Sequence, residues 1–164
     1  MGRAASDLVC IETSGTQPSG SGWTQLTADS DSGDTIYVWP DNPGGLEAFS
    51  FPSPQDAILL EFSGPPPSVR AWSEGDTGYK TMANVASLSV EAPSPPRVGT
   101  LELLYLDSGG SSSASETSMA GWTYVGTDSN NNFAWWRAGT VAPATGNVSV
   151  SPPSQLDLLL AVLN

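Results

Sequence analysis

The chain has 164 residues, with 17 acidic and five basic side chains, no histidine and a formal net charge of −12. The missing histidine excludes Ser-His-Asp and Cys-His catalysis and nearly all catalytic zinc sites. The five basic residues are scattered along the chain and form no stripe that could follow a phosphate backbone. We therefore expect no binding to nucleic acid or to anionic membranes.

Short apolar runs rich in Val, Ile, Leu, Trp and Tyr alternate with turn clusters of Gly, Pro, Ser and Asn along the whole chain. This pattern is typical of an all-β sandwich or barrel. Little or no helix is expected, and residues 76–85 are the only helical candidate. In chain order, the apolar runs predict strands near residues 8–12, 23–27, 35–39, 46–51, 57–62, 68–72, 86–91, 101–106, 122–126, 133–137, 147–150 and 158–163.

One order of motifs occurs twice in the chain. GWTQL is followed by a polar turn and the aromatic run IYVW, and about a hundred residues later GWTYV is followed by a polar turn and FAWW. A Pro-containing bend and a long apolar run come next in both copies. The aligned segments are 8–12 with 101–106, 22–26 with 121–125, 36–39 with 133–136, and 55–62 with 155–162.

The repeat predicts one domain over residues 1–164, a single β-sandwich built from two related halves. The halves cover residues 1–64 and 98–164, and residues 65–97 form a connecting segment. Two topologies suit so many short strands, a jelly roll and an immunoglobulin-like sandwich, and we favour the jelly roll.

The acidic residues indicate neither a metal site nor a catalytic site. The run 29–34 has some likeness to a calcium loop, but its glycine is in the fifth place and Pro40 stands where an EF-hand has Glu. A solvated hairpin turn is the favoured interpretation. With 17 acids, some carboxylate pair at a glycosidase spacing is expected by number alone. We therefore assign no catalytic, cofactor or metal residues and expect no enzymatic activity.

Alternate residues of a strand face opposite sides of its sheet. The aligned pairs Ile36/Phe133 and Val38/Trp135 are the better core candidates in the two aromatic strands. The residues between them are then expected to point away from that core.

Five aromatic residues are candidates for such outward positions: Tyr37, Trp39, Trp72, Tyr79 and Trp136. An outward aromatic ring has three interpretations. It is covered by a loop of its own chain, it lies at a protein–protein interface, or it stacks on a sugar. The sequence leaves all three open.

Taken together, these motifs resemble a family of β-sandwich proteins and domains of tailed bacteriophages. In that family an apolar strand leads through a loop to a GW-T strand, an aromatic strand with an Arg, an Ala- and Pro-bearing bend and a long apolar strand. NNNFAWWRAGTVAP and LDLLLAVL fit the second half of this pattern, whereas residues 40–43 replace the Arg-Ala segment in the first half. The resemblance implies a virion structural protein, most like a head decoration (cement) protein on the outer capsid surface.

Partners follow from the same resemblance. It implies contact with the major capsid protein and with neighbouring copies of the chain, as in decoration proteins that form trimers. Residues 1–6, which include Arg3, are a candidate N-terminal arm, and a frayed terminus is the alternative. The candidate interface thus consists of Arg3, Tyr37, Trp39, Trp72, Tyr79 and Trp136.

The alternative function is a carbohydrate-binding or host-adhesion module of a phage appendage, with surface glycans as ligands. It requires some of the outward aromatics to be exposed and coplanar. No membrane span is expected, because the most apolar run, 158–163, is far shorter than the roughly 20 residues that a spanning helix needs. The first ten residues also lack the apolar region of a signal peptide.

Overall fold

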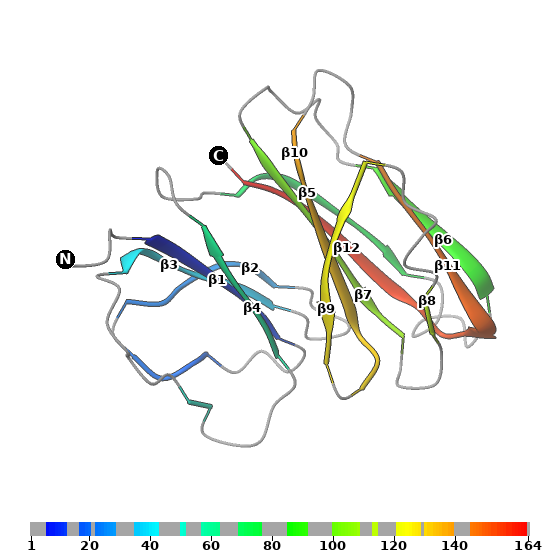
Figure 1. The fold of residues 1–164 in the computed structure, drawn as a ribbon, viewed down its shortest axis with the longest axis horizontal. Helices are drawn as coiled ribbons and strands as arrows, with labels where there is room; N and C mark the ends of the chain where they lie inside the picture. Colours follow the sequence, from blue (N-terminus) through cyan, green and yellow to red (C-terminus); the bar gives the residue numbers. More distant parts are fainter. Residues whose placement is uncertain are drawn as a thin grey trace. The chain divides into compact units, whose positions relative to one another are not determined.

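A computed structural model of the chain shows an all-β protein (Figure 1). Every regular element in the described residues is a strand, and all the strand pairs are antiparallel, which confirms the predicted fold class. The chain divides into two compact units, residues 1–68 and 69–164, which are treated separately below. The structure describes residues 6–12, 17–20, 22–28, 35–42, 50–51, 57–62, 69–76, 85–91, 100–108, 113–114, 121–128, 130–139 and 145–163.

Unit 1 contains one four-stranded sheet with the order β2-β3-β1-β4. Its strands are β1 (Ser6–Glu12), β2 (Thr24–Ala28), β3 (Thr35–Asn42) and β4 (Ala57–Phe62). Because side chains alternate along each strand, one face carries a buried set of aliphatic residues, and Cys10 and Tyr37 are buried on the other. The aliphatic set is Val9, Ile11, Ile36, Val38, Ile58 and Leu60.

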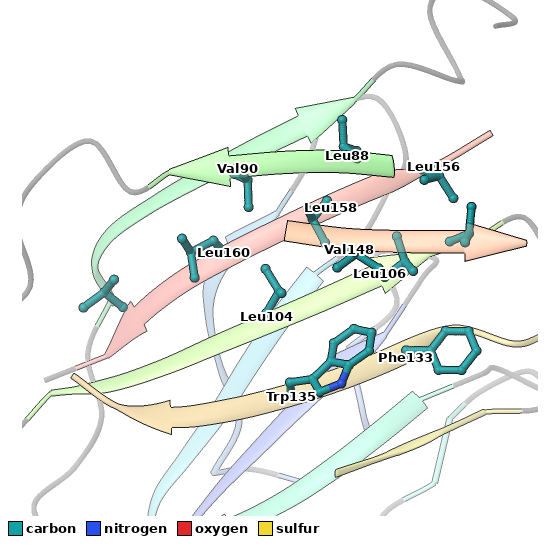
Figure 2. Packing of buried hydrophobic residues seen from close by; sticks show 12 residues of the cluster. Leu88, Val90, Leu104, Leu106, Phe133, Trp135, Val148, Leu156, Leu158 and Leu160 are labelled. Atoms are coloured by element: carbon teal, nitrogen blue, oxygen red, sulfur yellow. The ribbon is translucent and has the colours of Figure 1, made fainter. Parts of the chain in front are cut away.

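Unit 2 contains a five-stranded sheet, β5-β12-β7-β10-β9, and a three-stranded sheet, β6-β11-β8. Side chains of β6 and β11 pack against those of β7, β10 and β12 and form one apolar core, which includes the predicted core residues Phe133 and Trp135 (Figure 2). The strands are β5 (Val69–Asp76), β6 (Val85–Glu91), β7 (Leu101–Asp107), β8 (Ser113–Ala114), β9 (Thr123–Thr127), β10 (Phe133–Ala138), β11 (Thr145–Ser154) and β12 (Asp157–Leu163).

The strand order of unit 2 is that of a jelly roll. Counted within the unit, the first, eighth, third and sixth strands form one sheet, and the second, seventh and fourth form the other. The fifth strand, β9, pairs with the sixth strand, β10, rather than with the fourth. That fourth strand, β8, is only two residues long and offers a short edge for pairing. Of the two predicted topologies, unit 2 follows the jelly roll.

Unit 1 repeats four strands of this jelly roll. The order β2-β3-β1-β4 corresponds to β9-β10-β7-β12, so the aligned strands of the two halves have the same order. The central pairings also keep the register that the sequence repeat predicts. The matched Cα partners are Val9 with Val38 and Leu60 in unit 1, and Leu104 with Trp135 and Leu160 in unit 2.

Two further segments extend the comparison. Within unit 1, the Ser19 amide donates to the Ser50 carbonyl at 2.7 Å. In the sequence alignment this bond falls near the pairing of β8 with β11 within unit 2. Residues 69–76 and 85–91, which the sequence placed in the connecting segment, form β5 and β6 and belong to the sheets of unit 2.

The single-domain organisation stays a prediction. Residues 46–49 of the predicted strand 46–51 lie outside the described residues, as do residues 77–84 of the helical candidate.

Candidate functional site

The GWT motif of unit 1 builds an aromatic cluster on its own sheet. Trp23 is buried and meets Trp39 edge-on, with ring centroids 5.7 Å apart and planes at 67°. The backbone at Gly22 lies directly on the indole of Trp39, because a Cβ there would stand 1.9 Å from its Nε1. Any larger residue than glycine would therefore displace the ring. Trp39 is partly exposed and covered by its own chain at these contacts.

Beneath these rings, Tyr37 and Cys10 lie directly opposite each other on β3 and β1. Both are buried and belong to the same cluster as Trp23. The lone cysteine thus fills apolar space in unit 1, which is the usual role of a buried thiol. Tyr37 does lie on the opposite face from Ile36 and Val38, as predicted, but its ring is not offered at the surface of the chain.

The GWT motif of unit 2 makes a different contact. The Arg137 guanidinium lies over the Trp122 ring, with Cζ 4.5 Å from the ring centroid. Its Nε donates to Glu102 Oε2 across the β10–β7 pair. Glu102 is fully buried and its Oε1 has no hydrogen-bond partner among the described residues. Arg137 is 17% exposed, and Trp122 is also partly exposed.

A one-residue difference in register explains why the two tryptophans behave differently. In unit 1, Thr24 lies opposite Val38, whereas in unit 2 the aligned Thr123 lies opposite Trp136, one position further along the strand. A shift of one residue turns every side chain of a strand to the other face of the sheet. Trp23 therefore joins the face of Tyr37, and Trp122 joins the core face of Trp135.

Both edge strands nevertheless keep the same irregularity. The pairing skips one residue in each, Leu26 in β2 and Val125 in β9. These two residues are aligned in the sequence repeat. Such a β-bulge bends and twists an edge strand, which discourages further strands from adding to it.

The turn between β9 and β10 is held by a polar network. The Asp128 carboxylate accepts from the backbone amides of Asn130 and Asn132 and from the Asn132 side-chain amide, at 2.9 to 3.1 Å. Asn132 Oδ1 in turn accepts from the Ser108 amide at 3.2 Å, and the Ser108 carbonyl accepts from Ser154 Oγ at 3.1 Å. The network ties the turn to the ends of β7 and β11, so these polar residues stabilise the fold of unit 2.

Aspartates from three neighbouring strands share one row of the five-stranded sheet. Asp157 on β12 lies opposite Asp76 on β5 and Asp107 on β7. Asp157 is buried and Asp107 is partly exposed. Across the part of the chain that the structure describes, no group of three or more His, Cys, Asp and Glu residues is placed to hold a metal ion.

The structure brings together only some of the candidate interface residues. Tyr37 and Trp39 share the aromatic cluster of unit 1, and Trp136 is partly exposed on β10 of unit 2. Trp72 lies on β5 opposite Ala161, but its side chain is outside the described set. Arg3 and Tyr79 lie outside the described residues. An interface role for this set stays a prediction.

The sequence analysis missed the cluster of Trp122, Arg137 and Glu102. Its only sequence signal is the FAWWR run, in which Arg137 has the same parity as the core residues Phe133 and Trp135. Recognising the cluster also requires the pairing of β10 with β7, which places Glu102 opposite Arg137. That pairing joins residues 35 positions apart and is a property of the folded sheet.

In the described ranges, no helix has the length and apolar character needed to cross a membrane. The chain matches no known family, no curated protein and no solved structure.

Proposed function

We infer that the protein is a non-enzymatic structural component of a bacteriophage virion, most like a head decoration protein that binds the outer capsid surface. The observation that carries the proposal is the tandem of related sheets, the second of which belongs to a jelly roll. Jelly rolls recur in viral capsid proteins and in lectins. Because a fold alone does not fix a function, the resemblance of the repeated motifs to tailed-phage proteins supports the choice of the capsid.

The chemistry of the described polar residues is consistent with a structural role. Buried Asn132 and Ser108 bind the backbone of neighbouring strands, and buried Glu102 binds Arg137. These groups stabilise contacts between neighbouring segments of the sheet. The partners that we propose are the major capsid protein and neighbouring copies of the chain, in a trimeric or monomeric arrangement on capsomers.

A binding experiment with capsids tests the proposal. Heads of the phage that encodes the chain would be prepared without this protein by deleting its gene, and purified protein would be added back. We expect it to co-sediment with the heads at a fixed ratio and to appear as added density on the outer surface in electron micrographs. Protein that stays in the supernatant, and that occurs only in the cytosol of infected cells, would contradict the proposal.

Carbohydrate binding is the second candidate, and one observation favours it. Trp122 is partly exposed beside Arg137, and in the described contacts only Nε of that guanidinium binds a carboxylate. An indole next to guanidinium N–H donors is a combination suited to sugar hydroxyls. A glycan array probed with the wild type and with Trp122→Ala tests this role. Equal or absent signals from both proteins would reject it without affecting the capsid proposal.

A further inference from the structure

One difference between the hairpin of β9 and β10 and its counterpart in unit 1 lies at residue 137. Arg137 aligns with Pro40, and its partner Glu102 aligns with Asp7. Proline has neither a charged group nor a side-chain donor. Only unit 2 therefore has a guanidinium beside its GWT tryptophan, Trp122.

Arg137 connects three adjacent strands of unit 2. It belongs to β10, its Nε binds Glu102 on β7, and its planar face lies on Trp122, the residue before β9. A buried carboxylate that has lost its cation is strongly unfavourable, so Glu102 holds the guanidinium over the core face of the sheet. A guanidinium fixed there attracts the indole to the same face by a cation–π contact.

The corresponding sheet of unit 1 has the other register. Unit 1 has the same strand order, the same central pairings and a bulge at the aligned residue, yet its edge strand is shifted by one position. The bulge and the sheet order thus leave the choice between the two registers open. The described features that separate the two hairpins include the Arg137 cluster and the Asp128 network in unit 2, and the contacts of Trp39 with Gly22 and Trp23 in unit 1. By the sequence alignment, the turn is also two residues longer in unit 1.

We propose that Arg137, held by Glu102, is a register lock for the edge strand β9. The lock decides which face of the sheet the GWT tryptophan occupies. With it, Trp122 packs on the core face beside Tyr124 and Trp135. Without it, β9 moves by one residue toward the register of unit 1, and Trp122 passes to the face of Trp136.

Cross-strand nuclear Overhauser effects in NMR spectra report the register directly. In the wild type, Thr123 is opposite Trp136, whereas the shifted register places Thr123 opposite Trp135. The test variant carries Glu102→Gln and Arg137→Met, because a neutral pair avoids a buried lone charge while the Met chain still fills space over Trp122. We expect cross-peaks between Thr123 and Trp135, and loss of at least half of the intensity between Thr123 and Trp136.

Two further variants complete the design. Asp107→Asn removes a carboxylate from the same strand as Glu102 without touching Arg137, and it should keep the wild-type register. Arg137→Lys keeps a cation beside Glu102 but loses the planar group that stacks on Trp122. We therefore expect a second set of β9 peaks from the shifted register. This milder variant decides the question if the double variant does not fold. Retention of the Thr123–Trp136 contact alone in every folded variant would overturn the proposal.

Discussion

Gly146 offers the sharpest test of how closely the two sheets of unit 2 pack. A Cβ at this position on β11 would stand 2.5 Å from Cδ1 and 2.7 Å from Cδ2 of Leu104, where ordinary contacts begin near 3.4 Å. Leu104 is fully buried in the core that β11 shares with its neighbours (Figure 2), so its side chain could move only against other packed residues. We therefore predict that Gly146→Ala destabilises the protein.

The expected magnitude follows from two opposing effects. Adding a methyl group to a well-packed core costs about 1–3 kcal/mol. Replacing Gly by Ala also restricts the unfolded chain, which stabilises the native state by about 0.4–1 kcal/mol. The free energy of unfolding should thus fall by about 1–2 kcal/mol, which lowers the melting temperature by roughly 4–8 °C per kcal/mol for a unit of this size.

Gly126 provides the matched control on the edge strand β9. A Cβ there meets no atom within 4 Å, so Gly126→Ala should leave the stability unchanged or raise it by up to about 1 kcal/mol. Urea unfolding followed by tryptophan fluorescence measures both variants, and equal m-values would show that the native and denatured states are comparable. Equal transition midpoints for the two variants would refute the packing argument.

A double variant separates the clash from other effects of the alanine. Leu104→Ala alone should cost about 2–5 kcal/mol, because it leaves a cavity. In the Leu104→Ala background the new methyl group at residue 146 has room, so Gly146→Ala should no longer destabilise. A coupling energy of more than about 0.5 kcal/mol between the two sites is expected for residues in contact. If the changes in the free energy of unfolding simply add, the new methyl group does not clash with the Leu104 side chain.

Two other predictions use matched residues. Asn132→Ala removes side-chain hydrogen bonds to Asp128 and Ser108, so it should lower the free energy of unfolding by about 1–3 kcal/mol in the same urea assay. The control is Asn130→Ala at an exposed position. It keeps the backbone hydrogen bond to Asp128 and should change the free energy of unfolding by less than about 0.5 kcal/mol. On β4, Leu60→Ala should lower the free energy of unfolding by about 2–5 kcal/mol because Leu60 is buried. Leu59→Ala should lower it by less than about 1 kcal/mol because Leu59 is 40% exposed. Equal losses at the two sites would mean that the inward and outward residues of this strand are wrongly assigned.

Local patterns were sufficient to predict most of the strands and the relation between the halves. The predicted run 57–62 coincides with β4, and the aligned pairs Ile36/Phe133 and Val38/Trp135 are all buried. These predictions succeed because side-chain alternation is a local property that neighbouring residues already reveal. The repeat adds long-range information, since two aligned copies must place their aligned strands at equivalent positions of a sheet.

The sequence does not reveal features that depend on pairing between distant strands. GWTQL and GWTYV align without a gap, yet Trp23 and Trp122 face opposite sides of their sheets. The register of an edge strand depends on turn geometry and on contacts such as that of Arg137 with Glu102, and neither is visible in the motif itself. The role of residues 69–91 was missed for a related reason. Their apolar runs were recognised, but nothing local indicates that β5 pairs with β12 at the far end of the chain.

The two copies differ in burial at an aligned position of β4 and β12. Leu59 and Leu159 are aligned and pair with equivalent residues, but Leu59 is 40% exposed and Leu159 only 2%. β4 forms an edge of its sheet, whereas β12 lies between β5 and β7. All seven residues of β12 are buried, so both faces of this strand are covered and a continuous apolar run is expected. The run DLLLAVL of β12 has this character, while AILLEF of β4 alternates and places Glu61 where β12 has Ala161. The sequences of the two strands therefore match their different burial, and the pairing with β12 makes β5 part of the fold of unit 2 and not a linker.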